Sequence, residues 1–316
     1  MARVLVTGGA GFIGSHVVDA LVAGGAEVVV VDNLSTGRRE NVPGATGLVQ
    51  RGIEEPSLLE VFRRQRPEAV VHLAAQSSVA ASMRDPALDA RTNILGAINL
   101  LRCCQETGVK RVVYTSTGGA LYGEPTYLPC DERHPIEPLS YYGLSKHTVE
   151  RYLKLFAQDT GLRYTILRFA NVYGPRQDPY GEAGVVAIFA SLLLQGKAPT
   201  IFGDGEQTRD FVYVEDVVQA CLSALERGAS QAYNIGTGTQ TSVNSLFRSL
   251  ASLTGYRGQP IYGPPRSGDV RHIALTPQKA ATELGWRPQT ALAAGLERTV
   301  AHFRQARAPT GRGGQR

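Results

Sequence analysis

The first 170 residues of this chain alternate short apolar strand patterns with segments long enough to form helices. The strand patterns, rich in β-branched residues, lie at 3–6, 27–31, 47–50, 69–73, 111–115 and 163–168. Parallel strands need a long crossover between them, usually a helix, and these crossovers cover both faces of the sheet. The sequence therefore predicts an α/β fold built on a doubly wound parallel sheet.

The pattern changes after Asn171. A helix is predicted over about 183–195, and short strands, turns and helices follow to about residue 303. We expect a first lobe over 1–170 and a smaller second lobe drawn mainly from 171–303, with the functional site in the cleft beyond the carboxyl ends of the strands. Residues 304–316 have the Arg-, Gly- and Pro-rich composition of a disordered tail.

A glycine-rich loop joins the first strand to the first helix. It reads TGGAGFIG over 7–14, and it places Gly8, Gly11 and Gly14 three residues apart. Such a loop turns tightly and brings backbone N–H groups at a helix N-terminus close to a pyrophosphate. Glycine loops are also common between strands and helices in general, so the motif needs support from elsewhere in the chain.

Asp32 gives that support. It ends the second strand pattern, EVVVV, 18 residues after Gly14. An acidic side chain at this place accepts hydrogen bonds from the adenosine ribose and repels a 2′-phosphate, which favours NAD over NADP. The alternative is that Asp32 is only a turn residue before Asn33.

Tyr142 and Lys146 are the candidate proton-handling pair. Residues four apart lie on one face of a helix, and a cation near a phenol lowers the phenol pKa from its usual value of about 10. A hydroxyl from Thr117 or Ser116, at the end of another strand, would complete a relay in which a substrate alcohol loses its proton as its carbon loses a hydride. The alternative is a chance Tyr-x-x-x-Lys in a chain with 13 Tyr.

Composition excludes several other classes of protein. The net charge is +5, but four Arg of the tail account for most of it, so nucleic acid is not an expected partner. The longest apolar run, 185–194, is shorter than the ~20 residues of a membrane span. The four Cys and six His show no metal-binding spacing. We expect a cytoplasmic protein without a metal.

The order of the motifs resembles the extended short-chain dehydrogenase/reductase family over about residues 2–303. The motifs are TGGAGFIG, DNLSTG, HLAA, STGGALYG, YYGLSK, RFANVYGP, TRDFVYVEDV and YNIGTG. Within that family the chain is most similar to the bacterial UDP-glucose 4-epimerases. The resemblance implies a Rossmann-type lobe, tightly held NAD, oxidation of a UDP-hexose at C4 by way of Tyr142, rotation of the 4-keto intermediate, and return of the hydride to its other face.

The resemblance also assigns residues to the two ligands. The cofactor would be lined by Gly8, Gly11, Phe12, Ile13, Gly14, Asp32, Asn33, Ile53, Ala74, Gln76, Asn93, Tyr142, Lys146 and Phe169. The UDP-sugar would be held by Asn171, Val185, Thr200, Phe202, Arg209, Arg266, Asp269 and Ile273. Two Arg suit a pyrophosphate because a guanidinium binds its oxygens in bidentate fashion. Arg209 has the alternative of a surface pair with Asp210.

Two positions depart from the family pattern. Gly118 and Gly119 follow Thr117 where many epimerases carry a third hydroxyl residue, so Thr117 is our preferred hydroxyl and Ser116 the second choice. The usual Gly-Asp-Ile is Arg51-Gly52-Ile53, so the carboxylate expected beside the adenine amine is missing. We expect backbone groups near Ile53 to hold the adenine instead.

The substrate and the reaction have alternatives. Ile273 is expected beside the C2 substituent of the sugar, where related epimerases have a bulkier Tyr, so plain hexoses should be preferred and N-acetylated ones tolerated. Its alternative is a core residue. Other possible functions are a UDP-N-acetylglucosamine or UDP-glucuronate 4-epimerase, a dehydratase or decarboxylase, and a non-catalytic NAD sensor. Dehydratases of the family carry Asp-Glu where this chain has Gly118 and Gly119.

A homodimer is expected from the resemblance. Family members commonly pair through two helices, for which the candidates are 92–106 and 142–158. The apolar faces of these helices would serve equally well in the core of one subunit.

Overall fold

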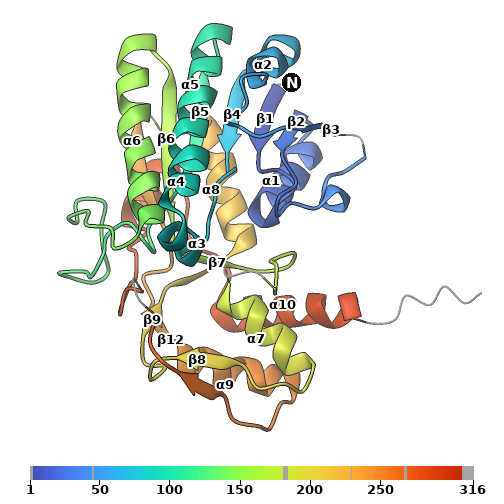
Figure 1. The fold of residues 1–316 in the computed structure, drawn as a ribbon, viewed down its shortest axis with the longest axis vertical. Helices are drawn as coiled ribbons and strands as arrows, with labels where there is room; N and C mark the ends of the chain where they lie inside the picture. Colours follow the sequence, from blue (N-terminus) through green and yellow to red (C-terminus); the bar gives the residue numbers. More distant parts are fainter. Residues whose placement is uncertain (1–2, 45, 181–183, 229, 267–268, 308–316) are drawn as a thin grey trace, which may run out of the picture.

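A seven-stranded parallel sheet forms the centre of the first lobe (Figure 1). The computed structural model describes residues 3–44, 46–180, 184–228, 230–266 and 269–307. In chain order the strands are β1 (Arg3–Thr7), β2 (Glu27–Asp32), β3 (Gly47–Gln50), β4 (Ala69–His72), β5 (Arg111–Thr117), β6 (Arg163–Phe169) and β11 (Gln231–Ile235). Their order in the sheet is β11-β6-β5-β4-β1-β2-β3. The direction of winding reverses beside β1, which is where open α/β sheets bind ligands.

Helices cover both faces of this sheet. One face carries α1 (Phe12–Ala23) and α8 (Val214–Glu226), and the other carries α2 (Leu58–Gln65), α5 (Gly96–Thr107) and α6 (Tyr141–Thr160). Alternation along β1 explains the two cores, because Val4 and Val6 pack in the first cluster and Leu5 packs in the second. The predicted doubly wound parallel fold is confirmed.

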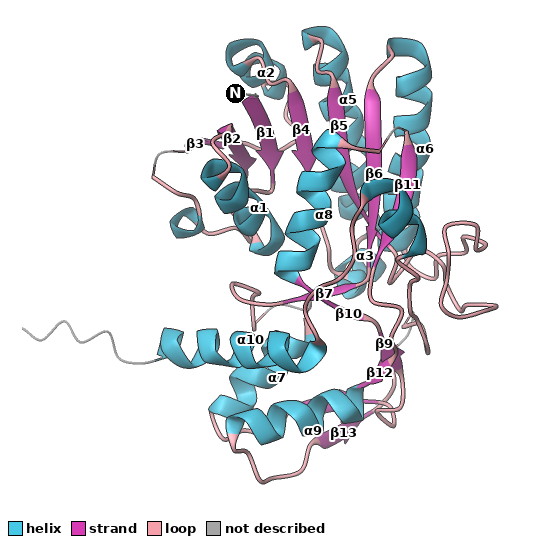
Figure 2. Ribbon diagram, turned by 180° about the vertical axis from the view of Figure 1, so that it is seen from behind, coloured by secondary structure: helices cyan, strands magenta, loops and turns pink. Residues whose placement is uncertain are grey.

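The second lobe packs three helices around small sheets (Figure 2). The helices are α7 (Val185–Leu194), α9 (Val243–Thr254) and α10 (Leu292–Arg307). The paired strands are β7 (Asn171–Tyr173) with β10 (Phe211–Tyr213), β9 (Thr208–Arg209) with β12 (Thr241–Ser242), and β8 (Thr200–Phe202) with β13 (Ile261–Gly263). Aromatic side chains including Phe189 and Phe247 fill this core.

The described chain also contains several short helical segments. They are α3 (Val79–Arg84), α4 (Pro86–Asp89), the π-helical segments Ala90–Leu95 and Ala280–Leu284, and a 3₁₀ turn, Arg39–Asn41. The helix expected over 92–106 is thus a π-helical segment followed by α5, and the helix expected over 142–158 is α6.

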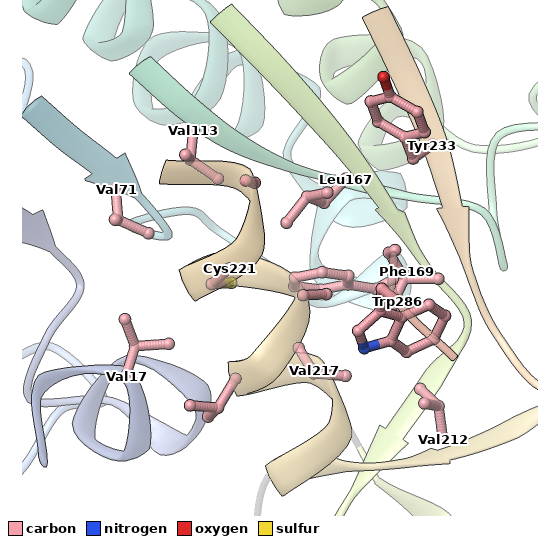
Figure 3. Close-up of a cluster of buried hydrophobic side chains, with 14 of the residues drawn as sticks. Val17, Val71, Val113, Leu167, Phe169, Val212, Val217, Cys221, Tyr233 and Trp286 are labelled. Carbon is pink, nitrogen blue, oxygen red and sulfur yellow. The ribbon is translucent and has the colours of Figure 1, made fainter. Parts of the chain in front are cut away.

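The chain returns to the first lobe after residue 171. Helix α8, strand β11 and Trp286 all contribute to the core beneath the sheet, where Trp286 lies with Phe169 and Val217 (Figure 3). Residue 170 is therefore where the chain first leaves the first lobe, and later segments complete that lobe's core. Helix α10 continues to Arg307, so the expected disordered tail begins with helix, and 308–316 lies outside the described residues.

Candidate active site

The glycine loop folds as a cradle between β1 and α1. Gly8 has a φ of +70°, and a Cβ there would lie 2.7 Å from the backbone nitrogen of Ala74. A Cβ on Gly14 would collide with the carbonyl of Gly8. Helix α1 begins after Gly11, which has no side chain to cap it, so the first N–H groups of α1 have no side-chain acceptor. These features fit a pyrophosphate at the helix N-terminus.

The Asp32 carboxylate joins the end of β2 to this loop. Its Oδ2 accepts a hydrogen bond from the Ala10 backbone nitrogen at 2.9 Å, and its Oδ1 accepts one from Leu34 at 2.8 Å. The residue is 7 % exposed, so it is more than a surface turn residue. A carboxylate has about four lone-pair sites, which leaves acceptors for ribose hydroxyls. The neighbouring Asn33 is exposed and accepts from the Ser35 backbone nitrogen.

A buried polar network links the loop after strand β4 to helix α6. Gln76 and Asn93 exchange two hydrogen bonds, of 2.8 and 3.0 Å, and Asn93 Nδ2 also donates to Ser145 Oγ of α6 at 3.1 Å. Asp89 Oδ1 accepts from both Gln76 and Asn93, while its buried Oδ2 has no hydrogen-bond partner among the described residues. Sequence reasoning missed Asp89, although its place four residues before Asn93 puts both on one helix face.

Tyr142 lies at the start of α6, where two serines fix it. Ser140 caps the helix by accepting from the Gly143 nitrogen at 3.2 Å, and the Tyr142 nitrogen donates to Ser82 Oγ at 3.1 Å. The Tyr142 phenol hydrogen-bonds with the Thr117 side chain at the end of β5. Burial raises the Tyr142 pKa to about 12, and the hydrogen bond to Thr117 opposes this rise.

Lys146 does not lower the Tyr142 pKa in this arrangement, which corrects the expectation from the sequence. Its Nζ lies 4.4 Å from the centroid of the Tyr114 ring, and the side chain is buried. Burial lowers the Lys146 pKa to about 7, while the negative charges of Glu150 and Asp89 raise it. Lys146 is therefore a buried amine that can gain or lose its proton near neutral pH.

The structure distinguishes the two candidate hydroxyls. Ser116 Oγ is buried beside the Glu150 carboxylate. Glu150 is held by Arg168 through two hydrogen bonds of 3.0 and 2.6 Å. Thr117, and not Ser116, reaches Tyr142. Glu150 and Arg168 were not predicted from the sequence, although Glu150 lies one helical turn after Lys146.

The residues expected to hold the UDP-sugar come from several elements of the second lobe. Asn171 opens β7, Val185 opens α7, Thr200 and Phe202 lie in β8, and Arg209 lies in β9. The Arg266 guanidinium carbon is 3.9 Å from the centroid of the Phe202 ring. Asn171 Oδ1 is buried and has no hydrogen-bond partner among the described residues.

Arg209 is not paired with Asp210. Asp210 is 1 % exposed, and its carboxylate accepts from the backbone nitrogens of Thr237, Gly238 and Leu275. Burial lowers the Arg209 pKa, and the negative charges of Asp269 and Glu124 oppose this. The surface-pair alternative for Arg209 is therefore wrong.

The remaining predicted residues lie in the body of the fold. Ile53 and Phe169 are buried, Ala74 packs against the core, and Phe12 and Ile13 begin α1 and pack toward the second lobe. Ile273 is 1 % exposed within the core of the first lobe, the environment of a core residue. Its place beside a sugar stays a prediction.

Within the part of the chain that the structure describes, no group of three or more His, Cys, Asp or Glu side chains is placed to hold a metal ion. Of the helices in the described ranges, none has both the length and the apolar character needed to cross a membrane.

The chain matches known proteins over nearly its whole length. The model of the NAD dependent epimerase/dehydratase family matches residues 4–236. A putative UDP-glucose 4-epimerase of Methanocaldococcus jannaschii is 48 % identical, over 94 % of this chain and 97 % of that protein.

Two solved structures of similar proteins are also UDP-glucose 4-epimerases. The UDP-glucose 4-epimerase of Thermotoga maritima, solved with UDP-glucose, is 53 % identical with a TM-score of 0.95, covering 96 % of this chain and 99 % of that one. The Thermus thermophilus UDP-glucose 4-epimerase, solved with NAD, is 45 % identical with a TM-score of 0.92 and the same coverage. The chain described here belongs to the NAD dependent epimerase/dehydratase family.

Proposed function

We propose that this protein interconverts UDP-glucose and UDP-galactose by inverting C4 of the hexose, with NAD as its cofactor. The observation that carries the proposal is the Thr117–Tyr142 hydrogen bond at the carboxyl edge of the sheet, with buried Lys146 one turn further along α6. Similar structures that contain UDP-glucose and NAD support the choice of ligands.

The cofactor site fits a dinucleotide. The uncapped N-terminus of α1 suits the pyrophosphate, and Asp32 suits the adenosine ribose. Bound NAD supplies the acceptor that takes a hydride from C4 and later returns it. The remaining tasks are to bind and orient the sugar and to move one proton, and these fall to the side chains of the protein.

Tyr142 is the proposed acid/base. As C4 is oxidised, the phenolate form of Tyr142 takes the proton of the 4-hydroxyl, and the resulting phenol gives that proton back when the ketone is reduced from the other face. Thr117 orients the phenol and offers a hydrogen bond to the same oxygen of the sugar. Lys146, one turn further along α6, is a buried amine that can gain or lose a proton near neutral pH, and it is proposed to line the cofactor.

The second lobe is proposed to bind UDP. Arg209 and Arg266 suit the two phosphates because a guanidinium donates paired N–H groups to phosphate oxygens. Asn171 Oδ1, which lacks a hydrogen-bond partner among the described residues, is available to accept a hydrogen bond from a sugar hydroxyl. Val185, Thr200, Phe202 and Asp269 are proposed to complete the nucleotide site.

The loop after β5 favours epimerisation over dehydration. A Cβ on Gly118 would lie 2.3 Å from Leu275 Cδ1, so Leu275 takes up the space of a side chain at that position. A Cβ on Gly119 would lie 3.4 Å from Asn171 Oδ1. Removal of water from a sugar needs an added acid and base. The two glycines carry neither.

A panel of UDP-hexoses tests the proposal. Incubation of the purified protein with UDP-glucose, UDP-galactose, their N-acetylated forms and UDP-glucuronate, followed by chromatography, should show interconversion of the first pair without a net redox change. A 4-keto-6-deoxy sugar, a pentose product or no turnover would contradict it. Tyr142→Phe should lose at least ~10²-fold in turnover while retaining NAD. Tyr141→Phe, an exposed neighbour, is the matched control.

We also propose a cytoplasmic homodimer. Leu144, Tyr152 and Leu155 lie at helical spacing on the outer face of α6, and Leu155 is 59 % exposed. Leu95, 58 % exposed in the adjacent π-helical segment, extends this apolar face. Contiguous exposed apolar residues of this kind mark contact surfaces. The four cysteines are buried free thiols, which suits a reducing compartment.

A further inference from the structure

The segment that follows β3 lies beside the proposed adenosine site. Asp32 at the end of β2 pairs in register with Gln50 of β3, and the Arg51 nitrogen donates to the Asp32 carbonyl at 3.1 Å. If Asp32 binds the adenosine ribose, the pyrophosphate attached to that ribose must lie at the glycine loop. The adenine base must then lie on the other side of the ribose, toward residues 51–54.

The backbone of this segment is fixed by its neighbours. Asn99 Nδ2 of α5 donates to the carbonyls of Ile53 and Glu55 at 2.8 and 2.9 Å. The Ile53 side chain is buried in the core, 3 % exposed. The backbone of residues 53–55 is therefore held in place beside Asp32, and this fixes the Cα positions from which the side chains extend.

Of the two adjacent acidic residues in this segment, Glu54 is the one whose carboxylate has no partner among the described residues. Glu55 Oε2 forms an ion pair with Arg51 at 3.1 Å, and Glu55 Oε1 accepts from the Gly52 nitrogen at 2.7 Å. Glu55 is thus used within the segment. The Glu54 side chain is exposed and has no hydrogen bond or ion pair among the described residues.

The Glu54 carboxylate lies over Gly52. A Cβ on Gly52 would be 2.7 Å from each Glu54 carboxylate oxygen, closer than a Cβ ever approaches an oxygen. Glu54 thus occupies the volume in which a side chain of residue 52 would begin. This is the position at which the sequence departs from the family pattern by lacking an aspartate, so the glycine makes room for a carboxylate from two residues further on.

We propose that Glu54 recognises the adenine base of NAD by accepting a hydrogen bond from its exocyclic amine. A carboxylate is an acceptor only, so it favours an amino group and disfavours a carbonyl oxygen at the same place on the purine ring. The inference rests on NAD being the bound cofactor. It adds to the proposed function a residue that selects the base.

A competition experiment tests this recognition. The full-length protein is equilibrated with an excess of equal amounts of NAD and nicotinamide hypoxanthine dinucleotide, in which a carbonyl replaces the amine, and the bound ratio is measured by mass spectrometry after denaturation. The wild type should prefer NAD by about tenfold, in line with the loss of one charge-assisted hydrogen bond. Glu54→Ala and Glu54→Gln should bring the ratio to about one, because the amide of Gln can also donate to a carbonyl.

Two further variants complete the test. Glu60→Ala, another exposed acid nearby in α2, should keep the wild-type ratio. Gly52→Asp in the Glu54→Ala background should restore the preference, because its carboxylate enters the vacated volume. A wild-type ratio in Glu54→Ala, or an equal loss of affinity for both dinucleotides, would overturn the inference while NAD remains the cofactor. A wild type that binds neither dinucleotide would overturn the proposed function as well.

Discussion

Ser116 and Thr117 are adjacent hydroxyl residues with different surroundings. The Ser116 hydroxyl faces the ion pair of Glu150 and Arg168, whereas the Thr117 side chain reaches the phenol of Tyr142. Successive side chains of a strand point to opposite sides, so only one of the two can serve the catalytic face. The sequence could not choose between them because its motif contains both.

The first prediction compares these two hydroxyls. Thr117→Val should lower kcat by about 10²-fold, because the phenol and the sugar oxygen lose a hydrogen-bonding partner at the reaction centre. Ser116→Ala should lower kcat by no more than a few-fold. Rates of UDP-galactose conversion at saturating substrate measure both, with Tm as a check on folding. Equal losses in the two variants would reject the assignment of Thr117.

The second prediction concerns sugar choice at Ile273. Ile273→Tyr should abolish turnover of the N-acetylated UDP-hexoses while sparing UDP-glucose and UDP-galactose, because the larger ring fills space at the C2 substituent. A pocket-size effect is worth about 1–3 kcal/mol. Ile273→Leu, which conserves volume, is the control for disturbance of the core in which Ile273 lies. Equal loss on both substrate pairs would show that the position is structural.

Single residues were predictable where a local motif carries them. The glycine loop, Asp32, Tyr142 and Lys146 stand in such motifs. Asp89 and Glu150 are held by neighbours distant in the sequence, Gln76 and Arg168, so no local pattern marks them. The direction of the Tyr142 pKa was also wrong from the sequence, because burial outweighs a helical neighbour's charge.

At the scale of elements, α6 is tied to β6 by a buried ion pair. Arg168 of β6 donates two hydrogen bonds to Glu150 of α6, and both side chains are about 5 % exposed. Burial would raise the Glu150 pKa, but the contact with His147 at 3.4 Å and the hydrogen bonds from Arg168 outweigh it and lower the pKa to about 2. The helix that carries Tyr142 and Lys146 is thereby held against the sheet.

The third prediction follows from this ion pair. Glu150→Gln should lower the free energy of unfolding at pH 7 by about 3 kcal/mol, at 1.36 kcal/mol per pKa unit. The folded pKa lies below the unfolded value of 4.5, so the stabilisation is complete above pH 4.5 and is lost as the pH falls toward 2. Urea unfolding at several pH values measures the difference between the two proteins.

A surface ion pair provides the control for the third prediction. Glu106→Gln breaks the pair of Glu106 with Arg63, whose side chains are 44 % and 64 % exposed. It should cost less than about 1 kcal/mol. An equal cost for the buried and the surface variants, or a Glu150→Gln difference that does not shrink below pH 4.5, would contradict the prediction.

The fourth prediction tests the outer face of α6 as a dimer contact. The double variant Leu144→Glu, Leu155→Glu should give a monomer of 33.9 kDa by light scattering, because burying two carboxylates at an interface is costly. Tyr262→Glu, on exposed β13, should leave the assembly unchanged. A wild-type monomer at working concentration, or an unchanged mass in the double variant, would reject this contact.

Elements were predictable where they show strong periodicity. Strands β1 to β6 agree with the sequence patterns within two residues. Strand β11 was missed because Gln231–Ile235 contains polar Gln231 and Asn234, and its burial comes from pairing with β6. The π-helical segment before α5 was also missed, because the π-helix has no sequence signature as regular as that of an α-helix.

At the scale of the whole molecule, the two lobes share one chain that crosses between them more than once. Trp286 follows most of the second lobe in sequence, yet its indole Nε1 donates to the Asp216 carbonyl of α8 at 2.7 Å, and its ring lies in the core of the first lobe. An ion pair between Arg176 and Asp19 of α1 adds a further link at the start of the second lobe.

The fifth prediction uses Trp286, the only tryptophan of the chain. Because it is 3 % exposed in the core of the first lobe, its fluorescence should report the unfolding of that lobe. Since residues on both sides of the second lobe complete this core, fluorescence and far-UV circular dichroism should give coincident urea transitions. Two separated transitions would show that the lobes unfold independently.

The late arrival of α8, β11 and Trp286 has a consequence for how the protein is made. A ribosome adds about 5–20 residues per second, so the nascent chain carries six strands of the sheet for about 2–9 seconds before residue 214 is added. During that interval the face that will receive α8, including Val71 and Val113, has no cover. Newly made chains should therefore engage a ribosome-associated chaperone until the final third of the polypeptide has left the exit tunnel.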